Sequence, residues 1–186
     1  MLFGEIRQPD SNYLIIPRHS SERRSYIPLG YETPDVICGD SCMILPDASL
    51  CDFGILISSV HMAWMRVVAG RLKSDYRYSA AIVYNNFPWP RSMSGASDES
   101  ELIRRRIEKT AQSILDARDL YPESSLADLY DPLTMPPELR KAHQLNDAAV
   151  LDAYDFNSRM SEDEIVARLL GMYAELTVAR AGLEMS

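Results

Sequence analysis

The sequence contains no apolar stretch long enough to span a bilayer, and its N-terminus lacks the apolar segment of a secretory signal. Internal repeats and low-complexity tracts are also absent. These absences predict a cytoplasmic protein with no membrane partner. With 186 residues, 46% of them hydrophobic, the chain can bury one sizeable core or two small ones.

Cysteine is scarce, with only Cys38, Cys42 and Cys51. An odd number of cysteines and no secretory context give no indication of a disulfide framework. Together with His61 they could form a zinc site, but Cys-x3-Cys followed by wide gaps lacks the paired spacing of structural zinc modules. We therefore predict no metal site, and thiols that are buried or idle.

An excess of positive charge is also lacking, since the formal net charge is −8. Residues 1–97 hold nine basic and nine acidic side chains, whereas residues 98–186 hold ten and eighteen and so carry the whole excess. A nucleic-acid-binding surface needs local positive charge and is therefore predicted in the first half. Arg18, Arg23 and Arg24 are its densest basic group and are candidates for phosphate contacts, with a solvated hairpin loop as the alternative.

Catalytic constellations are not evident. His61 lies beside Ser58 and Ser59, but no acid is spaced to complete a triad, so a packed histidine with one hydrogen bond is expected. Residues 86–89 contain an asparagine and aromatics, as the catalytic loop of amino-methyltransferases does, but not its paired prolines. No glycine-rich turn follows a strand to hold a methyl-donor nucleotide. We predict no catalytic and no cofactor-binding residue in this chain.

The first half is predicted to be rich in β-structure. Short apolar runs separated by turn residues predict strands over 25–31, 36–38 and 42–45, and further strands over 13–17 and 78–84. Residues that are apolar nearly all round predict one buried helix between them. This helix is expected to begin near Leu50 with Ser49 as its N-cap, and to end at Gly70.

The second half is predicted to be helical, after a small polar linker over residues 92–98. Helices are expected over 99–120 and 125–130, from Pro137, and after the capping box Ser161-x-x-Glu164. The predicted fold class is α+β, a small β-rich unit around one buried helix (1–91) followed by a small all-α helical domain (99–186).

The polar segment 70–79 is the strongest candidate site. Lys73, Asp75 and Arg77 alternate along the chain, and in an extended segment alternate residues point the same way. An acid between bases suits phosphate binding poorly, but it suits a G·C pair in the major groove, which offers acceptors on guanine and a donor on cytosine. A solvated loop with a local ion pair is the alternative.

Two blocks of the chain resemble MmeI-like restriction–modification enzymes, single chains with adenine methyltransferase and nuclease activities. The likeness to their target-recognition region is carried by segments 53–59, 70–72, 76–79 and 84–90, with His61 and Trp64. The likeness to their C-terminal helical region is carried by segments 111–118, 126–132, 135–136 and 139–143. The string Tyr84-Asn85-Asn86-Phe87-Pro88-Trp89-Pro90 is highly specific, and both blocks occur in the family's order.

The resemblance implies a set of roles for residues of this chain. Residues just before the Arg-Tyr-Ser triplet contact bases in such enzymes, which falls here on Lys73 and Asp75. As our own hypothesis, Arg71, Arg77, Tyr78 and Ser79 contact DNA or support the loop. The implied partners are double-stranded DNA and an upstream methyltransferase domain of the same parent chain. S-adenosylmethionine is implied for that parent enzyme.

The expected function is sequence-specific DNA target recognition, as the non-catalytic C-terminal fragment of a DNA adenine-N6 methyltransferase of type II. The absence of a domain start over Leu2–Asp10 suggests that Met1 was added to a fragment. One alternative is a helical protein–protein adaptor, or a bracing module without direct base contacts. The other is a catalytic methyltransferase domain.

Overall fold

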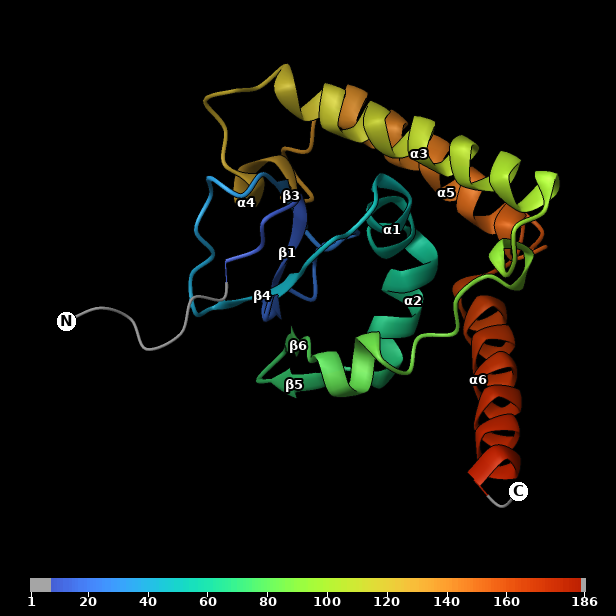
Figure 1. Cartoon of the computed structure of the whole chain (residues 1–186). Helices are drawn as coiled ribbons and strands as arrows, with labels where there is room; N and C mark the ends of the chain where they lie inside the picture. The colour runs from blue at the N-terminus through green and yellow to red at the C-terminus, as the bar shows by residue number, and fades with distance from the viewer. Residues whose placement is uncertain (1–7, 185–186) are drawn as a thin grey trace.

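Two small antiparallel sheets lie in the first half of the computed structural model, which describes residues 8–184 (Figure 1). One sheet has the strand order β3-β1-β4, with bounds Gly30–Glu32, Tyr13–Pro17 and Cys42–Leu45. The other has the order β2-β6-β5, with bounds His19–Ser20, Asp75–Arg77 and Gly70–Leu72. Arg18 joins them, because its N–H donates to the carbonyl of Ser41 (3.1 Å) and its carbonyl accepts from the N–H of Tyr78 (2.9 Å). The hypothesis of an added Met1 rests on Leu2–Asp10, and Met1 itself lies outside the described residues.

The strands predicted over 13–17 and 42–45 are confirmed. Of residues 25–31 only the last two join a strand, and the strand predicted over 36–38 is wrong. The carbonyl of Val36 accepts instead from the side-chain amide of Gln8 (2.8 Å) and from the hydroxyl of Tyr13. Side chains thus satisfy backbone that a neighbouring strand would otherwise pair.

The strand predicted over 78–84 is also wrong, because residues Ala80–Tyr84 form a π-helical turn, η1. The N–H of Asn85 donates to the carbonyl of Ala80 (2.8 Å), and Ser79 caps the turn by accepting from the N–H of Ile82 (3.3 Å). Trp64 Nε1 donates to the carbonyl of Val83 (2.9 Å). This tertiary contact outweighs the strand propensity of an Ile-Val-Tyr run.

The predicted buried helix is present but divided into α1 (Leu50–Leu56) and α2 (Ser59–Val68), bent by 56°. Ser49 caps α1 as expected. Ser58 causes the break, since it has extended dihedrals and its side chain accepts from the N–H of His61, as an N-cap does. α2 ends shortly before the expected Gly70, with Ala69 as its C-cap, and Gly70 begins β5.

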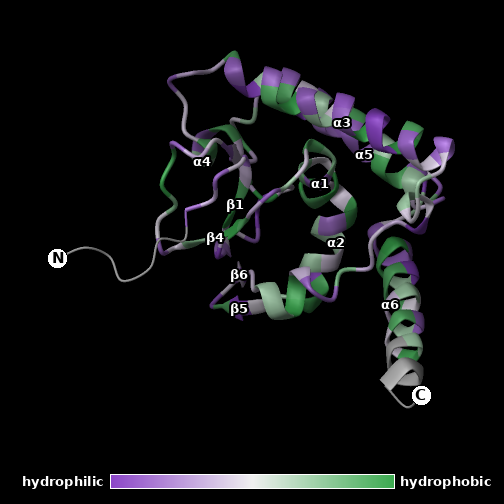
Figure 2. Cartoon of the chain, in the orientation of Figure 1, coloured by the Kyte–Doolittle hydropathy of each residue, from purple (hydrophilic) through white to green (hydrophobic). Residues whose placement is uncertain are grey.

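The second half consists of helices, as expected. Their bounds are Asp98–Asp119 (α3), Leu126–Leu129 (α4), Pro137–Ala153 (α5) and Glu162–Glu184 (α6), after a 3-10 turn, η2, at Arg91–Met93. Ser161 and Glu164 form the predicted capping box of α6. In Figure 1, α3 and α5 run side by side above α1. α6 lies to the right of α2, on the side away from the two sheets. Figure 2 shows mostly hydrophilic residues along α3 and apolar residues through α1.

One hydrophobic core runs through both halves. It contains Leu14 of β1, Phe53 of α1, Ile107 of α3 and Val150 of α5, all fully buried. The proposed division at 92–98 therefore stays a prediction. Among residues 8–184 no single helix is long and apolar enough to cross a membrane, and only the bent pair α1–α2, which is core, meets that criterion.

Candidate nucleic-acid interface

The segment predicted to contact bases forms a two-stranded β-hairpin. β5 and β6 are antiparallel, with the pairs Gly70–Arg77, Arg71–Tyr76 and Leu72–Asp75. Lys73 and Ser74 form the turn, and Lys73 has a left-handed backbone with φ of 57°, which is uncommon for a residue with a side chain. A two-stranded ribbon has the right width to enter the major groove of B-DNA.

Lys73 and Asp75 differ in their surroundings. Lys73 is exposed at the tip of the hairpin and forms no ion pair with any described residue. Asp75 is half-buried, and its Oδ1 accepts weakly from the N–H of Glu22 (3.4 Å). Asp75 and Arg77 point to the same side of β6, but the alternation does not extend to Lys73 because that residue lies in the turn. The predicted shared face therefore holds for Asp75 and Arg77 only.

Arg71 is held within the hairpin. Its guanidinium lies 4.0 Å from the ring centroid of Tyr76 and donates to the carbonyl of Ser74 (2.9 Å). It also approaches Glu22 Oε2 at 3.8 Å. These contacts tie the strand to the turn, so Arg71 supports the loop.

Tyr78 and Ser79 follow β6 and anchor the end of the hairpin to neighbouring elements. Tyr78 is 3% exposed, and its hydroxyl lies 2.9 Å from Nε2 of His61 in α2. Burial raises the pKa of Tyr78 above its usual range, so the phenol stays neutral. Ser79 caps the following π-helical turn. Their positions leave Tyr78 no surface for a ligand and tie Ser79 to the backbone.

The three arginines predicted to contact phosphates lie before and after β2. Arg18, before β2, is exposed and its Nε donates to the carbonyls of Asp40 (3.3 Å) and Cys42 (3.2 Å). Arg23 and Arg24, after β2, line a hollow of about 360 Å³ with Ser74 and Asp75. The other walls of this hollow are Ser21, Glu22, Asp131 and Pro132. The structure thus brings Arg23 and Arg24 beside the β5–β6 hairpin.

His61 is a packed residue, as predicted. It is fully buried in α2 and makes one side-chain hydrogen bond, to Tyr78. Burial lowers its pKa to about 3, so the ring is neutral at physiological pH. Within residues 8–184 no three His, Cys, Asp or Glu side chains gather as metal ligands would. Cys51 is buried, and burial raises the pKa of its thiol to about 12.

The segment 85–90 forms a rigid exit from the hairpin region, as expected. Asn86 Nδ2 donates to the carbonyls of Ala81 (2.9 Å) and Ile82 (3.1 Å). The ring of Phe87 packs edge-on against His61, with ring centroids 4.5 Å apart, and also against Trp89. The residues that resemble a catalytic loop therefore serve the fold.

Sequence reasoning missed a set of contacts from the helical half. Asp147 of α5 accepts from the hydroxyl of Tyr26 (2.7 Å) and from the N–H of Ser59 (2.8 Å). The partners lie 121 and 88 residues apart in the chain. No spacing or motif in the sequence indicates such a pair.

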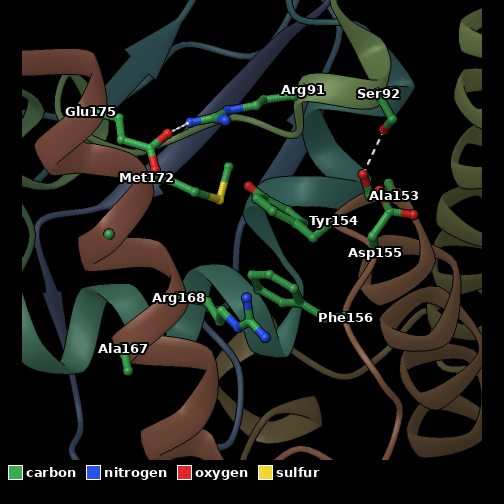
Figure 3. Close-up of a pocket in the computed structure, with 11 residues that line it drawn as sticks. Arg91, Ser92, Ala153, Tyr154, Asp155, Phe156, Ala167, Arg168, Met172 and Glu175 are labelled. Carbon is green, nitrogen blue, oxygen red and sulfur yellow. Dashed lines mark hydrogen bonds and ion pairs between the residues drawn. The ribbon is translucent and has the colours of Figure 1, made fainter.

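A second cavity, of about 350 Å³, lies between η2, the C-terminal end of α5 and α6 (Figure 3). Arg91 forms an ion pair with Glu175 across it, and Ser92 donates to the carbonyl of Ala153. Arg168, Met172 and Phe156 also line it. None of the residues predicted to contact DNA is among its walls.

Two family models match the chain in succession. The first, described as the target recognition domain of MmeI, matches residues 1–91. The second, described as the C-terminal domain of MmeI, matches residues 100–180. Both agree with the blocks of resemblance in the sequence.

Longer proteins show the same likeness. A protein of Bacillus subtilis (strain 168) named DNA methyltransferase A is 42% identical over 177 residues, which are 94% of this chain and 19% of that protein. A solved structure of the type IIL restriction–modification enzyme MmeI in complex with DNA superposes with a TM-score of 0.84 and 45% identity, over 93% of this chain and 22% of that one. The chain thus spans about a fifth of the length of these relatives.

Proposed function

This chain belongs to the MmeI-like family of type IIL restriction–modification enzymes, of which it carries the target recognition and C-terminal domains, and we propose from this premise that it selects the DNA sequence at which a longer protein methylates adenine at N6. The relatives named for methylation and for a DNA complex are about four to five times as long as this chain. We therefore assign the chain target recognition and not methyl transfer.

The β5–β6 hairpin carries this proposal. Among the described residues, the ammonium group at its tip forms no ion pair, and the carboxylate two residues later has only one weak donor. Double-stranded DNA offers matching groups on one base pair, because guanine O6 and N7 accept hydrogen bonds and cytosine N4 donates one. In our proposal Lys73 donates to guanine and Asp75 accepts from the paired cytosine.

The remaining candidates act on the backbone of DNA or on the hairpin itself. Exposed Arg18, Arg23 and Arg77 neutralise phosphates, which positions the duplex without selecting its sequence. Arg24 is half-buried and lines the hollow beside the hairpin, where it adds to the local positive charge. Arg71 keeps the turn in shape through Ser74.

The residues described do not fit a methyl-donor nucleotide. Both sheets are antiparallel, and none of the six described strands is followed by a glycine-rich turn and a helix, the arrangement that holds such a nucleotide. The S-adenosylmethionine of the reaction is therefore assigned to the rest of the longer protein. This chain contributes the choice of site.

The proposal is tested by exchanging the two base-recognition residues in the full-length protein. We expect Lys73→Asp with Asp75→Lys to change the methylated consensus at one base pair, from G·C to C·G, because donor and acceptor change places. Methylated adenines would be mapped by single-molecule sequencing of DNA exposed to each protein. The matched control is Lys109→Asp with Asp116→Lys, an exchange of two exposed residues on α3 that keeps the net charge.

The outcomes separate cleanly. A change at one base pair with the hairpin exchange, and none with the α3 exchange, supports the proposal. Methylation with an unaltered consensus removes Lys73 and Asp75 from base recognition. The same change with both exchanges would mean that the effect does not depend on the hairpin residues.

A further inference from the structure

We propose that Asp147 and Tyr26 are positioning residues for base recognition, through which the helical half fixes the β5–β6 hairpin on the DNA-facing side. This inference rests on the proposed function of the hairpin. Neither residue lines the hollow beside Asp75, and neither belongs to a strand of the hairpin. Their effect on DNA is therefore indirect.

Asp147 links two separate segments to α5. One carboxylate oxygen, Oδ2, accepts from the hydroxyl of Tyr26 (2.7 Å), and Oδ1 accepts from the N–H of Ser59 (2.8 Å). Burial raises the pKa of Asp147, while the hydrogen bonds from Ser59 and Tyr26 favour its charged form. Ser59 is the first residue of α2, where a helix leaves N–H groups without partners and favours a negative charge.

Tyr26 is held on a second side as well. Its ring stacks on that of His143, with centroids 4.0 Å apart and an interplanar angle of 24°. The hydroxyl of Tyr130 lies 2.7 Å from His143 Nε2 and accepts from Arg118 Nε (3.1 Å) and Nη2 (2.6 Å). Since both lone pairs of Tyr130 are then used, its proton points to Nε2, and the neutral ring of His143 carries its own proton on Nδ1. Tyr26 thus lies against a network with defined hydrogen-bond directions.

The segment between Tyr26 and β2 contacts the hairpin directly. β2 pairs with β6, so that His19 lies opposite Arg77. Glu22 donates its N–H to Asp75 Oδ1 (3.4 Å), and its carboxylate approaches Arg71 at 3.8 Å. A shift of Tyr26 would move this segment and with it the donor that orients Asp75.

The second arm runs through α2 to β5. Ser59 begins α2, Ala69 is its C-cap, and Gly70 opens β5. Asp147 therefore restrains the start of α2, which leads into β5. Through Tyr26 it also restrains the segment that follows β2, the strand that pairs with β6. Two restraints on opposite sides of the hairpin fix its orientation as well as its distance from the helical half.

Orientation matters more for discrimination than for affinity. Side chains that recognise a ligand must be held within about 0.5 Å of the productive geometry. Phosphate contacts tolerate small shifts and supply much of the affinity for any sequence. Loosening the hairpin should therefore reduce the preference for the correct base pair before it reduces overall binding.

The test uses the full-length protein with Tyr26→Phe, which removes one hydroxyl and keeps the ring on His143. Asp147→Asn is the second variant, because it replaces the acceptor for Tyr26 by an amide N–H donor and can keep an oxygen toward Ser59. The matched control is Tyr121→Phe. Its hydroxyl likewise donates to a carboxylate of α5, Glu138 Oε2 (2.9 Å), at an exposed site.

Methylation rates would be compared on the cognate site and on a site changed at the base pair assigned to the hairpin. We expect the cognate-to-changed ratio to fall roughly tenfold in Tyr26→Phe, the size of effect of one hydrogen bond to a charged group. Asp147→Asn should act in the same direction, and Tyr121→Phe should leave the ratio unchanged. The Tm of each variant would report its stability separately.

An unchanged ratio in both variants, with a lower Tm or with methylation reduced equally on all sites, would make the contact purely structural and overturn the inference. The same fall in Tyr121→Phe would also overturn it. Failure of the proposed function looks different. In that case the exchange at 73 and 75 leaves the consensus of the otherwise wild-type protein unaltered, and no base pair can be assigned to the hairpin.

Discussion

His61 shows how strongly its surroundings determine the behaviour of one residue. Two serines beside a histidine suggest chemistry in the sequence, but α2 turns the ring inward, where it is 0% exposed and pairs with Tyr78. Its Nδ1 has no partner among the described residues. A buried neutral imidazole of this kind stabilises the fold only while it remains unprotonated.

The stability of this chain should therefore fall as the pH is lowered from 7.5 to 5.5. The folded-state pKa of His61 is about 3, below the ordinary 6.5 of the unfolded state, so the unfolded chain binds more protons between these values. The contribution of His61 is complete above pH 6.5 and is lost progressively toward pH 3. Over the stated range we expect a loss of about 1 kcal/mol from this residue, and His143, whose pKa burial also lowers, acts in the same direction.

Urea unfolding at a series of pH values would measure this slope. His61→Gln should make the slope of unfolding free energy against pH shallower, whether or not the substitution changes the stability at pH 7.5. His19→Gln, which replaces an exposed histidine, is the matched control. A slope that is the same in all three proteins would mean that other groups determine the acid sensitivity.

At the scale of elements, α1 is the helix on which both halves meet. A Cβ added at Gly54 would lie 2.6 Å from Ile107 Cγ2 of α3, 3.0 Å from Asn146 Oδ1 of α5 and 3.1 Å from Ala111 Cβ. Asn146 Nδ2 also donates to the carbonyl of Gly54 (2.7 Å). The lack of a side chain at this position allows two helices to approach α1 at once.

Gly54→Ala should destabilise the chain by about 1–3 kcal/mol, the usual cost of overpacking a filled core. The control is Gly171→Ala, in α6, where an added Cβ meets nothing within 4 Å. There alanine should stabilise by about 0.5–1 kcal/mol, because it favours a helix more than glycine does. Thermal and urea unfolding would measure both, and a neutral Gly54→Ala would show that the helices can separate at little cost.

The sequence could predict the elements whose cause lies nearby in the chain, and it could not predict those that depend on distant residues. The boxes Ser49–Asp52 and Ser161–Glu164 lie within one turn of chain, and the helices that they begin start where expected. The π-helical turn after Ser79 depends on Trp64, 19 residues away from Val83, so local strand propensity gave the wrong element. The assignment of Lys73 and Asp75 to base recognition, made from their chemistry and from the family resemblance, stays a prediction, whereas the Tyr26–Asp147 contact could be found only from the fold.

For the whole molecule, the distribution of charge decides which side would face DNA under the proposed function. The three consecutive arginines of α3 have partners within the chain: Arg104 donates to the carbonyl of Met93, Arg105 pairs with Glu101, and Arg106 pairs with Asp152. By contrast, Arg23 is exposed beside the hairpin and forms no ion pair with a described residue. A chain of net charge −8 can therefore present one local basic surface, on the side of β2 and β6.

Arg23→Gln should weaken the binding of the full-length protein to cognate and unrelated duplexes by equal factors. A residue that neutralises one phosphate releases about one counterion, so the slope of log K against log salt should become shallower by about 1. Affinities measured at several salt concentrations would give the slope, with Arg105→Gln as the control for removing an arginine elsewhere. An equal change of slope in Arg105→Gln would assign a phosphate contact to α3. A selective loss on the cognate duplex would make Arg23 a base contact, because phosphates are the same in every sequence and only a base contact can distinguish the two duplexes.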